Sequence, residues 1–248
     1  MKTITHIDGD IIVYSVGFAA NDDPIAFAKH SVKLLINRIV DRTEADEYVV
    51  HLTGKGNFRD ELATIQGYKE NRKDTPKPVH YKELRNYLET KYKAHIATGM
   101  EADDTMGIQA TSNDGDNHVI ATLDKDLNMI PCWHYNWRKD ELFEVVQPDA
   151  DKFFIVQLLT GDSTDNIPGL KRITGSMATK KIKEYCSEPD EFTVCIERIR
   201  ETYKEKAEDI DVDSVLHEIG NLLWIRRDGY DTWESYYEEC RKTQEEDT

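Results

Sequence analysis

Cysteine is scarce in this sequence and falls into no metal-binding pattern. The four cysteines among 248 residues are Cys132, Cys186, Cys195 and Cys240. No two of them form a CxxC pair or have a recognisable zinc spacing, which argues against a zinc ribbon or finger. We expect reduced thiols in a cytoplasmic protein, where disulfides are rare.

Long apolar runs are also missing. The opening residues, MKTITHIDGD, lack the apolar stretch of a signal peptide, and no segment approaches membrane-spanning length. The sequence contains no internal repeat and no low-complexity linker. Its hydrophobic content of 39% nevertheless supports a globular core. We therefore expect a soluble monomer that makes no contact with membranes.

Positive charge is in short supply. Lysine and arginine number 32 against 48 aspartates and glutamates, so the formal net charge is −16. This balance argues against a nucleic-acid partner. The argument weakens if the acidic residues are clustered as metal ligands, because bound cations change the local charge.

Hydrophobic patterning predicts strands that alternate with helices. This order predicts an α/β fold with a mostly parallel central sheet and helices on both faces. We expect residues 1–160 to form this core and residues 161–248 to form a helical region without strands. The predicted strands are 3–7, 47–52, 95–98, 118–122 and 132–137, and the predicted helices are 24–41, 82–92, about 101–112 and 150–159.

Carboxylates gather where the predicted strands end. The carboxyl ends of parallel strands meet at one edge of a sheet. The carboxylates at these ends therefore predict a shared divalent-metal site. Oxygen ligands favour Mg²⁺ or Mn²⁺, and two such ions suit an attack of water on a phosphodiester. Any one cluster alone would be an ordinary helix cap or turn. The clusters are Asp8 and Asp10; Glu101, Asp103 and Asp104; Asp124 and Asp126; and Asp162 and Asp165, the last after helix 150–159.

Two basic segments interrupt the acidic sequence. In the first, Tyr68 is suited to stacking on a base. Lys69 is suited to stabilising the transition-state charge, and Arg72 is suited to binding a phosphate. The second is suited to contacts with a phosphate backbone. Either segment alone is equally well explained as a solvated basic surface. The second segment contains Lys171, Arg172, Gly175, Lys180 and Lys181.

Two aromatic residue types carry no ligand signal. The histidines His6, His51, His80, His95, His118 and His134 show no paired spacing, and we interpret them as structural or surface residues. We expect the tryptophans to be packing residues.

The acidic and basic motifs together resemble those of the flap-endonuclease superfamily of structure-specific 5′-nucleases. The resemblance is strongest to phage 5′→3′ exonucleases, which degrade duplex ends and remove RNA primers. It extends over about residues 3–185. The matching motifs, in the family's order, are IDGD at 7–10, YKENR at 68–72, EADD at 101–104, TLDKD at 122–126 and GDSTDNIPG at 161–169.

The resemblance implies a PIN-like nuclease core, a clamp or arch at about 55–93 and a duplex-binding helix–turn–helix at about 166–185. It implies that Asp8, Glu101, Asp103 and Asp124 hold a first Mg²⁺ or Mn²⁺ ion. Asp126, Asp162 and Asp165 would lie nearer a second ion, Asp104 would hold the cluster together or bind through water, and Lys69 and Arg72 would contact the scissile or terminal phosphate. The implied substrates are duplex, nicked or flapped DNA and RNA–DNA hybrid.

Two departures from the family pattern stand out. Gly54 follows the second strand, where members often carry an aspartate, and Arg172-Ile173-Thr174-Gly175 replaces a glycine-rich hairpin. The segment from Arg72 to Tyr81 is short and contains two prolines, which favours an exonuclease over a strict flap endonuclease.

Three other functions are consistent with parts of the sequence. A haloacid-dehalogenase-type phosphatase would use Asp8 as nucleophile and Asp10 as acid–base. A PIN-type ribonuclease would share the acidic sheet edge, and a DNA-end-binding protein would have the fold without catalysis. The phosphatase interpretation leaves Glu101, Asp103 and Asp124 without a role.

Overall fold

The computed structural model describes residues 1–170, 175–185, 192–206 and 211–246, which form two compact units. The first unit comprises residues 1–57, 75–145 and 226–228, and the second comprises 58–74, 146–225 and 229–248. This division differs from the boundary expected at residue 160. Helix α6 (Gln147–Thr160) and residues 58–74 both belong to the second unit.

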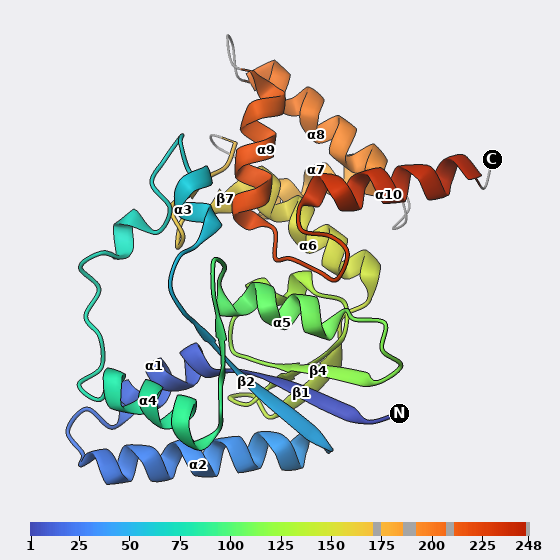
Figure 1. Ribbon diagram of the computed structural model, residues 1–248. Coiled ribbons are helices and arrows are strands. Elements are labelled where there is room, and N and C mark those ends of the chain that lie inside the picture. Colours follow the sequence, from blue (N-terminus) through green and yellow to red (C-terminus); the bar gives the residue numbers. More distant parts are fainter. Residues whose placement is uncertain (171–174, 186–191, 207–210, 247–248) are drawn as a thin grey trace. The chain divides into compact units, whose positions relative to one another are not determined.

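A six-stranded sheet forms the centre of the first unit, with the strand order β3-β2-β1-β4-β5-β6 (Figure 1). The first five strands are parallel, as predicted, and β6 pairs antiparallel to β5. Strand β6 was not predicted, because its four residues, ELFE, are too short and too exposed to give a clear pattern. The strands are β1 (Thr3–Asp8), β2 (Glu47–Thr53), β3 (His95–Ala97), β4 (Asn117–Ala121), β5 (Trp133–Asn136) and β6 (Glu141–Glu144).

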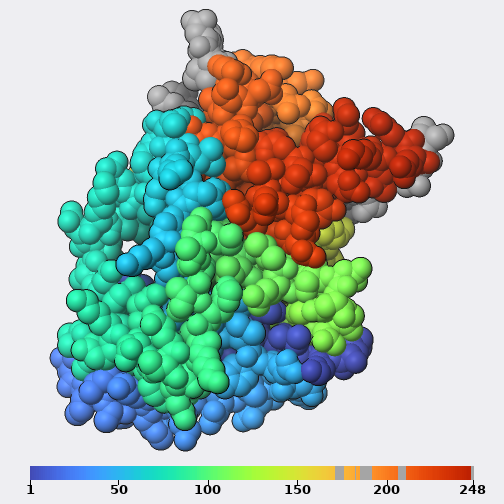
Figure 2. Space-filling model, in the orientation of Figure 1, coloured from blue at the N-terminus to red at the C-terminus, as the bar shows by residue number. Residues whose placement is uncertain are grey.

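Helices cover both faces of this sheet. Helix α5 (Ala102–Ala110) lies on one face, and α1 (Gly9–Ala19), α2 (Ile25–Arg42) and α4 (Tyr81–Lys91) lie on the other (Figure 1). Helices α2 and α4 form one continuous surface in Figure 2. The main apolar core lies on the three-helix face, and its fully buried members include Ile7, Ile12, Val32, Ile36, Leu52, Leu84 and Leu88.

A row of three buried histidines lies on the other face of the sheet, beneath α5. Successive residues of a strand point to opposite faces, so His6 and Ile7 lie on different sides. The Nδ1 atom of His6 lies 3.2 Å from Nε2 of His51, and its Nε2 lies 3.0 Å from Nδ1 of His118. Thr105 and Asp114 bind the two ends of this histidine row, at 2.9 and 3.0 Å. Burial lowers the pKa of His6 to about 3 and that of His51 to about 2. These histidines are structural, as the sequence suggested.

The second unit is largely helical, with an aromatic core. The rings of Phe154 and Trp224 meet edge to face at 5.1 Å, and Tyr236 stacks on Trp224 at 5.6 Å. Trp224 and Trp233 are buried, which confirms their expected packing role. The other helices of the second unit are α3 (Phe58–Leu62), the 3₁₀ turn Glu70–Arg72, α7 (Gly175–Tyr185), α8 (Phe192–Lys206), α9 (Val212–Leu223) and α10 (Trp233–Glu246).

Three sequence-based expectations need correction or restriction in this unit. The absence of strands after about residue 150 is wrong, because Gly161–Asp162 and Ile167–Pro168 form a two-stranded antiparallel ladder. Cys195 is disulfide-bonded, so not every thiol is reduced as expected. The turn of the expected helix–turn–helix, including Lys171 and Arg172, lies outside the described residues. Across the described ranges, every helix is too short or too polar to span a membrane.

Candidate active site

Asp8 occupies the point where the order of the sheet reverses. It ends β1, which lies between β2 and β4. From β1 the strand order runs through β2 to β3 on one side and through β4 and β5 to β6 on the other. Ligand sites of open α/β sheets form at such points. The carboxylate is buried and accepts hydrogen bonds from the Ile11 N–H at 2.9 Å and the Thr122 hydroxyl at 2.7 Å. Burial raises the pKa of Asp8 to about 7, and the charges of Asp10 and Asp124 raise it further against these two bonds.

Thr122 connects this carboxylate to the next acidic loop. Its hydroxyl donates to Asp8 and accepts from the Asp124 N–H at 2.9 Å. Asp124 in turn accepts a hydrogen bond from the Asp126 N–H at 2.9 Å, and Lys125 lies 3.3 Å from the Asp126 carboxylate. The loop after β4 is therefore folded around its own aspartates, and Asp124 is placed beside Asp8.

Asp10 has a different set of partners from Asp8. One carboxylate oxygen accepts from the Thr53 N–H at 2.8 Å and the other from Arg85 at 2.7 Å. Arg85 also donates to the Thr53 carbonyl at 2.7 Å. Both oxygens of Asp10 are thus engaged in fixing the end of β2 and helix α4 to the start of α1.

The three carboxylates that begin α5 are placed in three different ways. Glu101 caps the helix and accepts from the Asn57 amide at 3.0 Å. Asp103 is partly exposed on the first turn. Asp104 is fully buried and accepts from the backbone N–H groups of Glu101 and Arg226, at 3.1 and 3.2 Å. Asp104 therefore holds the helix start in place, and two carboxylates are left at the surface of the site.

Gly54 cannot be replaced by a carboxylate in this backbone. A Cβ atom at this position would lie 2.2 Å from the Ala97 carbonyl oxygen and 2.8 Å from the Ile96 side chain. The Gly54 N–H also donates to Ala97 at 2.9 Å, which holds β3 close. The missing aspartate is thus a consequence of how closely β3 approaches β2.

The donor chemistry of this edge fits a divalent cation, although the side chains do not form a closed cluster. Asp8, Glu101, Asp103 and Asp124 offer only oxygen, as Mg²⁺ and Mn²⁺ prefer. Burial raises the pKa of Asp8, so a cation at this position would stabilise the ionised carboxylate. In the described part of the chain, no three histidine, cysteine, aspartate or glutamate side chains converge closely enough to hold an ion.

In the second unit, Asp165 brings together the two remaining motifs. Its carboxylate lies 2.6 Å from Arg72 and 3.5 Å from Lys69, and accepts from the Tyr68 hydroxyl at 3.2 Å. The Lys69 N–H donates to the Asp165 carbonyl at 2.9 Å. Asp162 is buried and accepts from the Thr164 N–H at 2.7 Å. The YKENR and GDSTDN motifs therefore form one structural element. Within it, the side chains of Lys69 and Arg72 pair with the Asp165 carboxylate.

The second basic segment is described only in part. Helix α7 begins at Gly175, and its Lys180 and Lys181 lie 3.9 and 4.0 Å from Glu184. Such contacts between exposed side chains are weak and leave both lysines accessible to a polyanion.

Three residues that position this site went unnoticed in the sequence. Arg85 and Thr53 fix Asp10, and Thr122 fixes Asp8 and Asp124. Thr122 is the first residue of the TLDKD motif, so it was accessible to inspection. Arg85 was not, because nothing in a basic helix indicates which cation meets a carboxylate 75 residues away.

This arrangement, an acidic switch point on a parallel sheet, is typical of nucleases that use metal ions. Residues 3–148 match the family model described as "5'-3' exonuclease, N-terminal resolvase-like domain". The match covers more than half of the chain, and the chain belongs to this family. The resemblance inferred from the motifs is thereby confirmed.

Individual relatives agree with this assignment. The chain is 31% identical to an exodeoxyribonuclease of Enterobacteria phage T3 over 49% of its own length and 42% of the relative. It is 24% identical to a 5'-3' exonuclease of Buchnera aphidicola over 74% of its length and 71% of the relative. The chain thus spans less than half of the phage T3 protein.

A solved structure shows the same fold. The bacteriophage T5 flap endonuclease, determined as a pseudo-enzyme-product complex with DNA and metal ions, superposes with a TM-score of 0.58. The alignment covers 98% of this chain and all of the T5 chain, at 16% sequence identity. At this identity the likeness establishes the fold alone.

Proposed function

We propose that the protein is a divalent-metal-dependent 5′→3′ exonuclease that hydrolyses phosphodiester bonds at the 5′ ends of duplex DNA. The observation that carries the proposal is the buried Asp8 carboxylate, joined through Thr122 to Asp124 at the reversal of the sheet. Its family supplies the reaction class.

Asp8, Glu101, Asp103 and Asp124 are the residues that would hold the cation, and a second ion would lie nearer Asp126. When bound, Mg²⁺ or Mn²⁺ supplies an activated water and stabilises the leaving oxygen. Thr122 and Asp104 keep the ligands in place through the hydrogen bonds described above. Asp162 and Asp165 belong to the proposed second site by resemblance only.

The substrate contacts follow from the basic residues of the second unit. Lys69 and Arg72 bind phosphate oxygens, Asp165 orients both cations, and Tyr68 stacks on a terminal base. Gly175, Lys180 and Lys181, together with Lys171 and Arg172, contact the duplex backbone without reading its bases. RNA–DNA hybrid, nicked DNA and flapped DNA are further substrates under this proposal, with a role in phage DNA replication in the host cytoplasm.

The phosphatase alternative fits the geometry less well. It requires Asp10 to donate and accept a proton, yet both Asp10 oxygens are bound by Thr53 and Arg85. No observation favours it over the nuclease.

A gel assay on 5′-labelled and 3′-labelled duplex, flapped and hybrid substrates tests the proposal. The wild type should release short 5′ products with Mg²⁺ and none with EDTA, and Asp124→Asn should reduce the rate by at least about 100-fold. Asp116→Asn is the matched control, because Asp116 is a partly exposed acid just before the opposite end of the same strand, and asparagine keeps the oxygen that accepts from the Lys2 N–H.

The size and polarity of the products separate the remaining alternatives. Mononucleotides indicate exonuclease activity, and longer fragments from flaps indicate an endonuclease. DNA binding without any cleavage would identify the non-catalytic end-binding protein. Hydrolysis of nitrophenyl phosphate without cleavage of DNA would refute the nuclease and favour the phosphatase.

A further inference from the structure

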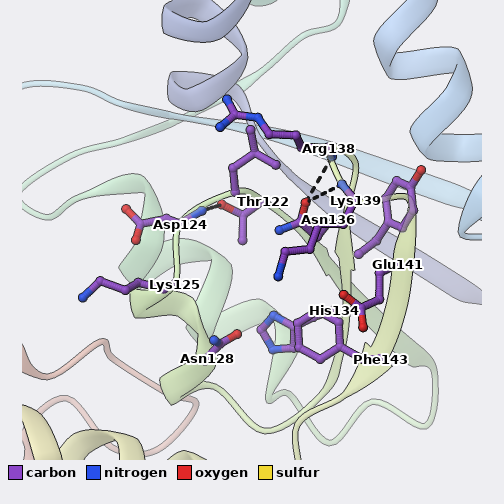
Figure 3. Close-up of a pocket in the computed structure, with 12 residues that line it drawn as sticks. Thr122, Asp124, Lys125, Asn128, His134, Asn136, Arg138, Lys139, Glu141 and Phe143 are labelled. Atoms are coloured by element: carbon purple, nitrogen blue, oxygen red, sulfur yellow. Dashed lines mark hydrogen bonds between the residues drawn. The ribbon is translucent and has the colours of Figure 1, made fainter. Parts of the chain in front are cut away.

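A cavity of about 510 Å³ opens beside Asp124, between the loop after β4 and the β5–β6 hairpin (Figure 3). This volume lies within the range of sites that bind small ligands. Lys125 and Asn128 lie on one side of the cavity, and Asn136 and Lys139 lie on the other. All of the lining residues belong to the first unit.

The cavity has a basic rim. Lys139, in the hairpin turn, brings a positive charge to the cavity, and Arg138 and Lys125 add two more at its edge, where Lys125 also lies 3.3 Å from the Asp126 carboxylate. The carboxylates of the lining are those of Asp124 and Glu141. This excess is unusual in a chain whose net charge is −16. It favours an anionic ligand, and a cation held by Asp124 would increase that preference.

The hairpin that carries these cations is held in one conformation. The Asn136 side chain accepts from the backbone N–H groups of Arg138 and Lys139, both at 3.1 Å (Figure 3). Asp140 has a left-handed φ of 56° and accepts from the Tyr135 hydroxyl at 2.7 Å and from Arg42 at 2.5 Å. The turn therefore presents its two cations from a fixed backbone, which reduces the entropy lost on binding.

An aromatic pair forms another wall of the cavity. The rings of His134 and Phe143 are stacked, with centroids 5.6 Å apart and an interplanar angle of 21°. His134 is almost fully buried, and its Nε2 atom lies 2.9 Å from the Ile130 carbonyl oxygen, to which it must donate. Burial lowers the pKa of His134 to about 4, so the ring is neutral and Nδ1 is an acceptor. Within the described ranges this buried Nδ1 has no hydrogen-bond partner.

Together these features match one class of ligand. A phosphate suits the basic rim, a planar ring suits the aromatic wall, and N–H groups on that ring suit the exposed acceptor Glu141. We propose that the cavity binds a deoxynucleoside 5′-monophosphate, the product of exonucleolytic cleavage, with a preference for guanine. This inference rests on the proposed function, because it places the released nucleotide beside the reacting carboxylates.

Guanine is preferred because of the pattern of donors on its edge. Its N1–H and N2–H₂ groups can be bound together by one carboxylate, whereas thymine offers only a single N–H. Glu141 is exposed on β6 and lines the cavity beside Phe143, so its carboxylate is available for this contact. A base preference is a property that phosphate binding alone would not produce.

Calorimetry with the full-length protein and dGMP, dTMP and inorganic phosphate tests the proposal, in Mg²⁺ and in EDTA. We expect one dGMP per chain, with dTMP and phosphate each bound at least about tenfold more weakly. Lys139→Gln should weaken both nucleotides about tenfold, and Glu141→Gln should weaken dGMP but not dTMP. Lys33→Gln, an exposed lysine on α2 away from the cavity, is the matched control.

Two outcomes would overturn the proposal: no dGMP binding at millimolar concentration, or binding that Lys139→Gln and Glu141→Gln leave unchanged. Both substitutions are at exposed positions, and circular dichroism checks that the variants are folded. Nuclease activity is measured on the same preparations. An active nuclease that binds no nucleotide refutes the cavity assignment alone, and nucleotide binding without cleavage refutes the exonuclease alone.

Discussion

The histidine row makes the stability of the first unit depend on pH between about pH 7.5 and about pH 5. His6 and His51 are buried, and burial lowers their pKa to about 3 and about 2 in the folded protein. In the unfolded chain a histidine has a pKa of about 6.5. The unfolded state therefore takes up protons in this window while the folded state does not. The row's contribution to stability is complete above about pH 6.5 and is lost as the pH falls towards the folded pKa values.

The magnitude follows from the same values. At about pH 5, a histidine with an unfolded pKa of about 6.5 and a folded pKa far lower loses about 2 kcal/mol of stabilisation. His6 and His51 together should lose about 4 kcal/mol, a large part of the stability of an ordinary domain. Every group that faces His6 in the row is itself a histidine, so no carboxylate in direct contact offsets its protonation.

Urea unfolding followed by circular dichroism at about pH 7.5 and about pH 5 measures this loss. His6→Gln keeps a donor and an acceptor at the position but does not titrate. It should be less stable than the wild type at neutral pH and should lose about 2 kcal/mol less on acidification. His30→Gln, on the exposed surface of α2, should keep the wild-type pH dependence. Equal losses in His6→Gln and wild type would refute the reasoning.

Other contacts yield further predictions. Gly54→Ala should cost about 2 kcal/mol or more in thermal unfolding, because its Cβ would lie 2.2 Å from the Ala97 carbonyl oxygen, and an unchanged Tm would contradict this. Arg85→Met should destabilise the protein by about 1 to 3 kcal/mol, because it leaves the Asp10 carboxylate without the Arg85 guanidinium. Lys82→Met is the control and should leave the free energy of unfolding unchanged. Asp165→Asn should speed trypsin cleavage after Lys69 and Arg72 several-fold, and unchanged proteolysis would show that these contacts do not hold the segment. Mg²⁺ at a concentration 100-fold above Kd should raise the free energy of unfolding by about 2.7 kcal/mol and raise the Tm accordingly, and Asp8→Asn should abolish the gain.

Local patterns were sufficient to predict the sheet and most of its helices. Strands β1, β2 and β4 are short apolar runs bounded by polar turns, and they form as expected. Helix α1 was missed because its segment, GDIIVYSVGFA, is apolar on most sides and has no clear helical period. Strand β6 was missed because its four residues follow a turn set by Asp140, whose left-handed conformation the sequence does not indicate.

Spacing alone predicts that the carboxylates share one metal site, and the structure gives its members different partners. Asp8 is buried, Asp104 anchors the start of α5, and Asp10 is bound to Arg85. These differences arise from partners far away in the sequence, such as Thr122 for Asp8 and Arg226 for Asp104. Composition and spacing specify that carboxylates meet at one edge, but not which oxygen each of them binds.

The histidine row also has a hydrogen count. Five contacts run from the Ala102 carbonyl through the Thr105 hydroxyl and the three imidazoles to Asp114. Each hydrogen bond needs one hydrogen, whereas three neutral imidazoles and one hydroxyl supply four. While the three rings are neutral, one of the five contacts therefore has no hydrogen. The tautomers of the three rings decide which contact that is, so the gap can move along the row without any change in the backbone.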